Sequence, residues 1–239
     1  MAACKKIAHR GASGNYPEST RLALEKAIAA GADMIELDCQ MTQDGHVVIF
    51  HDEKLRRTAG GRGALRDKTL AQLKKLDIGR WRGKAFAGER ILTLEEGLEI
   101  LAGKVDLCLE FKTFGAATPG LDLKILFTLS HYDYLDRTIL SSFDYHCLTR
   151  LRDHAPEAVL GIIYGAAVRE DPFEAARRLG AASIHVQKEL ATRDFLRQAW
   201  DEGLDIHVWT VNEVREMRAF AALGIQGLIS DFPEKFGRL

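Results

Sequence analysis

Four short motifs combine histidines, carboxylates and basic side chains in a pattern that suits cation binding and acid–base catalysis. They are His9-Arg10-Gly11, Glu36-Leu37-Asp38, His51-Asp52 and Glu110-Phe111-Lys112. Each motif ends or follows a short apolar run of the kind that forms a buried β-strand. In a parallel β/α barrel, active sites lie at the carboxyl ends of the strands. The sequence therefore predicts that these side chains meet at one rim of a barrel.

Three carboxylates, Glu36, Asp38 and Glu110, form the centre of the predicted site. Residues two apart on a strand share a face, so Glu36 and Asp38 point the same way, as do Glu110 and Lys112. Two like charges about 4 Å apart repel by about 4 kcal/mol at an effective dielectric of 20, so the cluster must take up protons or a cation. Because every ligand is an oxygen, we expect one divalent cation, Mg2+ or Ca2+. A structural salt bridge to Lys112 or Arg10 is the alternative.

His9 and His51 are candidates for a general acid and a general base, because imidazoles exchange protons near neutral pH. Hydrolysis of a phosphodiester needs one proton removed from the nucleophile and one supplied to the leaving oxygen. Arg10 offers a planar set of donors that matches phosphate oxygens. The alternatives are merely hydrogen-bonded histidines and a structural ion pair of Arg10.

The apolar runs recur along the chain and alternate with amphipathic segments, which is typical of a TIM-type (β/α)8 barrel in the α/β class. Eight strands are predicted, at Lys5–His9, Met34–Asp38, Val105–Phe111, Thr138–Ser141, Val159–Ile163, Ser183–Val186, Asp205–Trp209 and Gly227–Ser230. Helices are predicted between them, at Ser19–Ala30, from the capping box at Thr93 towards Leu101, from Asp171-Pro172, at Arg193–Glu202 and at Asn212–Leu223.

One interval, between the second and third barrel strands, is much longer than the others. It contains a predicted strand at Val47–Phe50, which we expect to form a hairpin with Gln40–Thr42 outside the barrel. A glycine-rich stretch, Gly60–Gly63, and a short helix around Thr69–Leu76 follow. We interpret residues 52–92 as an insertion above the barrel mouth, within a single domain that spans residues 1–239.

Composition narrows the classes of function. The formal net charge is −1, so there is no global basic field for nucleic acid or anionic lipid. There is neither an apolar leader nor a run of about 18 apolar residues. The cysteines are scattered and are expected to be buried thiols in a reduced compartment: Cys4, Cys39, Cys108 and Cys147. We expect a cytoplasmic enzyme with a small-molecule substrate, no nucleic-acid partner and no stable membrane association; the oligomeric state is left open.

Taken together, the motifs resemble the glycerophosphodiester phosphodiesterase family almost from end to end. Six family motifs occur in the family's order: His9-Arg10-Gly11, Pro17-Glu18-Ser19-Thr20, Glu36-Leu37-Asp38, His51-Asp52, Glu110-Phe111-Lys112 and Trp209-Thr210-Val211-Asn212. The resemblance implies a barrel enzyme that releases sn-glycerol 3-phosphate and an alcohol. It implies His9 and His51 as the acid–base pair, Glu36, Asp38 and Glu110 as metal ligands, and Arg10 and Lys112 as phosphate contacts.

The resemblance also implies that Phe143 and Trp209 wall the glycerol side of the site, although Trp209 as ordinary barrel packing is the alternative. Ser19 replaces the family's usual asparagine, and we expect it to keep the role of helix N-cap. Glu18 is expected to bond a neighbouring side chain rather than the metal. His185 and Lys188 are expected either near the substrate's polar head or simply at the surface, and the remaining histidines, including His207, are expected to be structural.

Two other functions fit the same residues. One is a phospholipase-type or lysophospholipid phosphodiesterase on the same barrel, which would need an apolar rim or a membrane-binding loop. The segment Arg56–Arg90 is rich in charge and has only Trp81 and Phe86 as bulky aromatics, which disfavours deep insertion into lipid. The other is a noncatalytic phosphate- or metal-binding module, which the presence of both His9 and His51 disfavours.

Overall fold

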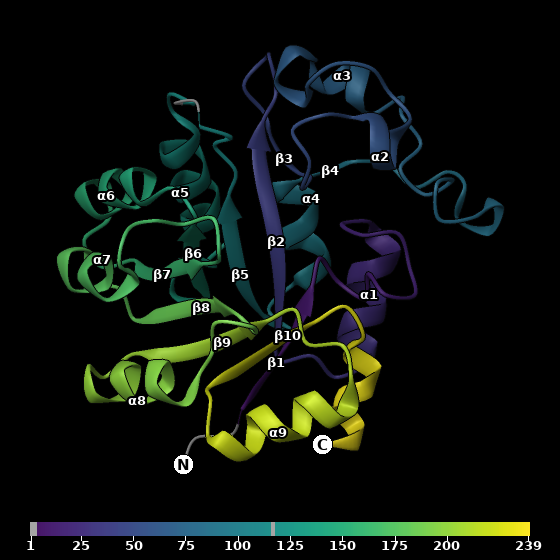
Figure 1. The fold of residues 1–239 in the computed structure, drawn as a ribbon. Helices are drawn as coiled ribbons and strands as arrows, with labels where there is room; N and C mark the ends of the chain where they lie inside the picture. The colour runs from purple at the N-terminus through teal and green to yellow at the C-terminus, as the bar shows by residue number, and fades with distance from the viewer. Residues whose placement is uncertain (1–3, 116–117) are drawn as a thin grey trace.

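The computed structural model describes residues 4–115 and 118–239, and its centre is a closed barrel of eight parallel strands (Figure 1). Their order around the barrel is β1-β2-β5-β6-β7-β8-β9-β10, and β10 pairs with β1 to close it. The predicted TIM-type barrel is confirmed. The strands are β1 (Lys5–His9), β2 (Met34–Met41), β5 (Asp106–Phe111), β6 (Thr138–Ser142), β7 (Val159–Tyr164), β8 (Ser183–Gln187), β9 (Asp205–Trp209) and β10 (Gly227–Ser230).

Helices lie around the outside of the barrel and cover the strands (Figure 1). Thr93 and Asp171 begin helices as predicted, because each side chain accepts hydrogen bonds from backbone N–H groups of the first turn. The helices are α1 (Arg21–Ala29), α2 (Arg56–Ala59), α3 (Leu70–Leu73), α4 (Leu94–Leu101), α5 (Leu121–His131), α6 (Tyr145–His154), α7 (Pro172–Leu179), α8 (Arg193–Asp201) and α9 (Val214–Leu223).

The N-terminus of α1 differs from the expectation, because Thr20 and not Ser19 is the N-cap. The Thr20 hydroxyl accepts from the N–H of Ala23 at 3.2 Å. Ser19 lies one residue earlier in a left-handed conformation, with φ 58°, and its buried hydroxyl has no hydrogen-bond partner within residues 4–115 and 118–239. The prediction for Ser19 was therefore wrong. The left-handed turn places its side chain away from the helix N–H groups.

The long interval after β2 contains the predicted hairpin. Strand β3 (Val47–Ile49) pairs antiparallel with the end of β2, where Gln40 lies opposite Val48. A further two-residue strand, β4 (Leu92–Thr93), which was not predicted, pairs with β3 on the other side. Between β3 and β4 the chain packs its own apolar cluster, which is made of Val48, Phe50, Leu55, Ala59, Leu65, Leu73, Ile78 and Ile91.

The register of the barrel strands fixes which chemical groups become neighbours. His9 on β1 lies beside Glu36 on β2, and Asp38 lies beside Glu110 on β5. Asp38 and Glu110 end up on adjoining strands at the same level, close to the carboxyl ends. The predicted gathering of these side chains at one rim therefore follows directly from strand pairing.

All four cysteines are free thiols, and Cys39, Cys108 and Cys147 are buried. This agrees with the prediction that they serve as small apolar side chains.

Within residues 4–115 and 118–239, every helix is too short or too polar to cross a lipid bilayer.

Two histidines are buried in the barrel interior, where apolar residues are usual. The rings of His185 and His207 stack at 4.7 Å, and both residues are at most 2% exposed. Two glycines on neighbouring strands leave space for these imidazole rings. A Cβ at Gly161 would lie 2.8 Å from His185 Nε2, and one at Gly227 would lie 2.6 Å from His207 Cδ2. Burial lowers the pKa of His185 to about 4 and that of His207 well below its ordinary value. The interior position of His207 agrees with a structural role.

We predict that His185 lowers the free energy of unfolding as the pH falls from 7.5 to 5, measured as the difference between the unmodified protein and a variant without this imidazole. Glu36 and Glu110, whose pKa values are raised, act in the opposite direction. Unfolded histidine takes up a proton near pH 6.5, whereas folded His185 does so only at about 4. Stability that is fully present above 6.5 is thus lost as the pH falls towards 4, because the unfolded chain binds the proton first. For His185 alone the loss by pH 5 is about 2 kcal/mol. Urea titrations followed by circular dichroism measure it.

A matched pair of variants isolates this contribution. His185→Gln should reduce the loss of stability with falling pH, whereas His154→Gln, on the exposed end of α6, should leave it unchanged. An equal loss in His185→Gln and the unmodified protein would show that other groups cause the pH dependence.

Candidate active site

A pocket of about 140 Å3 at the carboxyl ends of the strands collects the predicted site residues. Asp38 alone among them does not line the pocket; its side chain is 1% exposed and lies behind the pocket wall. The lining residues are His9, Arg10, Glu36, His51, Glu110, Lys112, Ser141, Phe143, Ile163, His185, Trp209 and Ile229.

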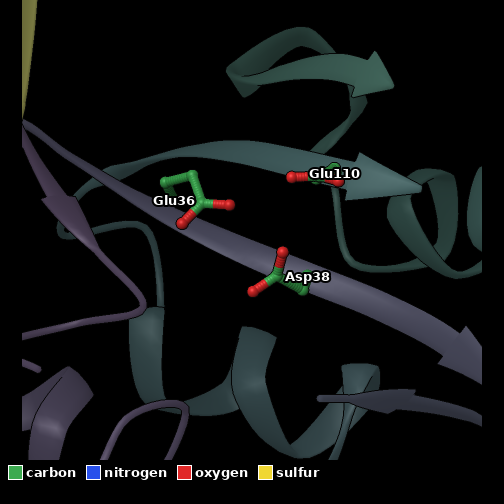
Figure 2. A group of neighbouring side chains, drawn as sticks. All are labelled: Glu36, Asp38 and Glu110. Atoms are coloured by element: carbon green, nitrogen blue, oxygen red, sulfur yellow. The ribbon is translucent and has the colours of Figure 1, made fainter. Parts of the chain in front are cut away.

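The three predicted carboxylates come together from two adjoining strands. Figure 2 shows Glu36 and Asp38 on β2 and Glu110 on β5. One oxygen from each can be chosen so that all lie within 4.8 Å of one another, and all three residues are buried. Such an all-oxygen cluster has the chemistry and size to hold a hard divalent cation.

Two cations share the charge of these carboxylates. Arg10 Nε lies 3.1 Å from Asp38 Oδ2, and Lys112 Nζ lies 3.0 Å from Asp38 Oδ1 and 2.5 Å from Glu110 Oε1. The salt bridges considered as an alternative from the sequence are thus present. Both oxygens of Asp38 are therefore ion-paired, and a bound metal ion would share this carboxylate with Arg10 and Lys112.

The pKa values of the three carboxyl groups indicate that Arg10 and Lys112 do not neutralise all of them when ionised. Burial raises the pKa of Glu36 well above its ordinary value, and the neighbouring charge of Asp38 raises it further. Burial also raises the pKa of Glu110 to about 7. For Asp38, burial opposes ionisation, but Lys112 and Arg10 outweigh it and hold the pKa below its ordinary value. Near neutral pH Glu36 therefore keeps its proton and Glu110 keeps it in part, and a cation could displace these protons.

His9 is anchored by a carboxylate from the other end of the chain. Its Nδ1 lies 2.6 Å from Asp231 Oδ1, and Asp231 also accepts from Ser13 Oγ and Asn212 Nδ2. Burial opposes ionisation of Asp231, but these hydrogen bonds lower its pKa to about 2. An ionised Asp231 can only accept, so Nδ1 of His9 carries the proton and Nε2, 3.9 Å from Glu36, is the nitrogen that faces the carboxylates.

His51 is anchored in the same way by its neighbour. Its Nδ1 lies 2.7 Å from Asp52 Oδ1, and Asp52 in turn accepts from Arg57 Nε at 2.6 Å. Burial lowers the pKa of His51 below its ordinary value, although the charge of Asp38 opposes this. His51 is therefore mainly neutral at pH 7, with Nδ1 bonded and Nε2 free.

Arg57 joins the two sides of the pocket mouth. Besides Asp52, it donates to both oxygens of Glu18, at 2.6 and 2.7 Å, and Glu18 also accepts from Arg10 at 3.0 Å. Charges of alternating sign thus run from His51 to Arg10. The expectation that Glu18 bonds a neighbouring side chain is confirmed.

Two aromatic side chains line the part of the pocket away from the histidines. Phe143 and Trp209 meet edge to face, with ring centroids 5.8 Å apart, and Lys112 Nζ lies 5.9 Å from the centre of the Phe143 ring. The Trp209 indole donates to the carbonyl of His185 at 2.8 Å. Phe143 remains 40% exposed, so its ring is available to a ligand.

Of the two further residues considered from the sequence, His185 lines the pocket although it is almost fully buried. Lys188 instead pairs with Glu216 at 2.9 Å.

Sequence reasoning missed Asp231 and Arg57 as partners of the site. Asp231 directly follows β10 and is therefore a strand-end carboxylate, a signal that could have been read in the same way as those on β1 and β2.

Comparisons with known proteins agree with this geometry. The model of the glycerophosphoryl diester phosphodiesterase family matches residues 9–235. A glycerophosphodiester phosphodiesterase of Caldanaerobacter subterraneus subsp. tengcongensis is 38% identical over 229 residues, which cover 95% of this chain and 94% of that protein. A relative of the same name from Bacillus subtilis is 32% identical, with 98% of this chain and 85% of that protein covered.

Solved structures give the same result. A phosphodiesterase of Oleispira antarctica in complex with the product sn-glycerol-3-phosphate has a TM-score of 0.89 and 30% identity, with 97% of this chain and 94% of that chain covered. The glycerophosphodiester phosphodiesterase of Thermotoga maritima has a TM-score of 0.81 and 27% identity, with 100% and 99% covered. On the family match and these similarities, this chain belongs to the glycerophosphoryl diester phosphodiesterase family, whose members are phosphoric diester hydrolases.

Proposed function

We propose that the protein hydrolyses glycerophosphodiesters to an alcohol and sn-glycerol 3-phosphate in a metal-dependent reaction, with His9 and His51 as the acid–base pair. The observation that carries the proposal is that two carboxylate-anchored histidines share one pocket with a cluster of three carboxylates. The Oleispira antarctica phosphodiesterase was solved with sn-glycerol-3-phosphate as its product, which supports this product here.

The histidines divide the two proton transfers between them. Because Asp231 and Asp52 accept from the Nδ1 atoms, each Nε2 is free to exchange a proton with the substrate. Burial favours the neutral form of His51, which suits it to act first as the base. His9, for this step protonated on both ring nitrogens, then supplies the Nε2 proton to the leaving oxygen. The nucleophile is either water or the 2-hydroxyl of the substrate's own glycerol.

The remaining predicted residues bind and orient the substrate. Arg10 and Lys112 face the pocket beside the carboxylates and would donate to phosphate oxygens. Phe143 and Trp209 would pack against the glycerol carbons. Glu36, Asp38 and Glu110 would hold one Mg2+ or Ca2+, which supplies positive charge to a phosphate group when bound.

We further propose that residues 1–239 act as one catalytic domain, with residues 52–92 as an insertion beside the pocket. The separate apolar cluster of that segment supports the interpretation. A cytoplasmic location is proposed on the free and mostly buried thiols, which are typical of a reducing compartment.

Replacing His51 or His9 with alanine should lower kcat/KM for glycerophosphocholine about 100-fold or more, because one of the two proton transfers loses its catalyst. The control His154→Ala should keep full activity, since this residue is exposed on α6. Release of sn-glycerol 3-phosphate in a coupled assay is the measurement. No turnover of the choline, ethanolamine, glycerol or inositol diesters by the unmodified protein, with either cation, would favour a noncatalytic binding module.

Binding of Mg2+ or Ca2+ should raise the melting temperature and release protons. Glu110, with a pKa of about 7, and Glu36, with a pKa well above its ordinary value, must lose protons to bind a cation. The affinity should therefore fall as the pH is lowered through 7, since protons then compete with the ion. Calorimetry in buffers of different ionisation enthalpy counts the protons released.

Glu36→Gln provides the test of the ligand set. It should abolish the shift of the melting temperature with cation, yet leave the metal-free protein about as stable, because the neutral amide replaces a carboxyl group that its raised pKa keeps protonated. A full shift in this variant would exclude Glu36 as a ligand. Glu99→Gln, exposed to solvent on α4 and outside the cluster, is the matched control.

Arg57→Ala should lower kcat/KM about tenfold and move the acid limb of the pH–rate profile to higher pH. Without Arg57, the charge of Asp52 acts on His51 alone and raises its pKa. Arg57→Lys should restore part of the activity, because it keeps the charge but not all four hydrogen bonds. A loss of rate with an unchanged pH profile would mean that Arg57 only holds the segment in place.

A further inference from the structure

Residues 52–92 carry a charge opposite to that of the rest of the chain. They contain twelve lysines and arginines but only five aspartates and glutamates, whereas the whole chain has 33 and 34. The rest of the chain therefore has an excess of eight negative charges. Because the segment begins directly after His51, its positive field lies beside the pocket mouth.

Two hollows on this segment share Lys54 and Arg56. The first is lined by Asp52, Glu53, Lys54, Arg56 and Arg57, and thus begins at the carboxylate that anchors His51. The second is lined by Lys54, Arg56, Arg62 and the glycines at 60, 61 and 63. We call the two together the basic groove, which runs from the edge of the candidate active site outward.

Three of the four cations that line the basic groove have no ionic or hydrogen-bond partner in the part of the chain that the structure describes. Lys54, Arg56 and Arg62 are exposed, and their side chains make no ion pair or hydrogen bond with any residue that the structure describes. Arg57, in contrast, is fully used by Asp52 and Glu18. The backbone also leaves room, because a Cβ at Gly60 would meet no atom within 4 Å. The groove therefore presents three cationic side chains that are available to a ligand, beside a backbone that no side chain covers at Gly60.

The strand order indicates which end of a substrate reaches this groove. Phe143 follows β6 and Trp209 ends β9, while the opposite arc of the barrel is formed by β1 and β2. The hairpin that leads to the basic groove continues from β2. With glycerol against Phe143 and Trp209, as in the proposed function, the alcohol part of the diester points towards β1, β2 and the groove.

We propose that the basic groove binds a second anionic group on the alcohol, so that the enzyme prefers glycerophosphodiesters whose alcohol carries an additional phosphate. This inference rests on the proposed function and names its substrate class. Guanidinium and ammonium donors suit the oxygens of a phosphomonoester, whereas a choline head group would gain nothing from them.

The test compares two substrates that differ by one phosphate: glycerophosphoinositol and the same compound phosphorylated on the inositol ring. At low ionic strength the unmodified enzyme should show a kcat/KM about tenfold higher for the phosphorylated compound, and added salt should reduce the difference. In Lys54→Gln/Arg56→Gln the preference should disappear, while the rate on glycerophosphoinositol stays unchanged.

The control variant Lys5→Gln/Lys104→Gln removes the same charge from exposed positions at the opposite end of the barrel. It should keep the preference. If it loses the preference as well, the effect comes from overall charge and the proposed subsite is wrong. Equal rates on both substrates in the unmodified enzyme would also overturn the proposal. If the groove binds phosphatidylglycerol vesicles and gives no such preference, its ligand is a membrane surface and the proposed substrate class is wrong.

A binding measurement separates this inference from the proposed function. Calorimetry with His51→Ala should show tighter binding of the phosphorylated diester, and this difference should vanish when Lys54→Gln/Arg56→Gln is added. If the enzyme turns over both diesters but binds them equally well, the proposed role of the basic groove is wrong, whereas the hydrolytic function stands. A difference in binding without turnover in the unmodified enzyme would refute the hydrolytic function alone.

Discussion

Three buried carboxylates on two adjoining strands need more positive charge than the two resident cations provide, and the rest of the site depends on this imbalance. Asp38 takes both Arg10 and Lys112 and stays ionised, while the pKa values of Glu36 and Glu110 are raised. A cation that enters such a site would displace protons from Glu36 and Glu110 and share Asp38 with Arg10 and Lys112. The low cost of this proton exchange would favour the proposed binding of a metal ion.

The turn after β1 holds Arg10 in place against this charge. Arg10 has a φ of 54°, a strained conformation for a residue with a side chain, and its N–H donates to the Glu36 carbonyl at 2.9 Å. Gly11 follows with a φ of 80°, and a Cβ there would lie 2.7 Å from the backbone of Ala23. The close approach of α1 thus requires glycine and fixes the direction of the guanidinium towards Asp38 and Glu18.

The sequence predicted the barrel and the carboxylate cluster well, because both follow from local patterns. The apolar runs gave every barrel strand, and alternation on β2 and β5 predicted the shared face of Glu36, Asp38 and Glu110. It did not predict the partners made by closure, such as Asp231. The N-cap at Thr20 was missed because the left-handed turn at Ser19 depends on packing, and β4 is too short for a periodic pattern to be visible.

Barrel closure therefore builds part of the proposed catalytic site as well as the fold. Asp231 follows the last strand, 222 residues beyond His9 in sequence, and the two meet only because β10 pairs with β1. His51, by contrast, is anchored by the adjacent Asp52 and by Arg57 within the same part of the chain. One histidine thus takes its orientation from long-range closure and the other from a local hairpin. A contact of such large sequence separation carries a cost in loop-closure entropy, and the proposed acid–base pair is complete only when the final strand has docked.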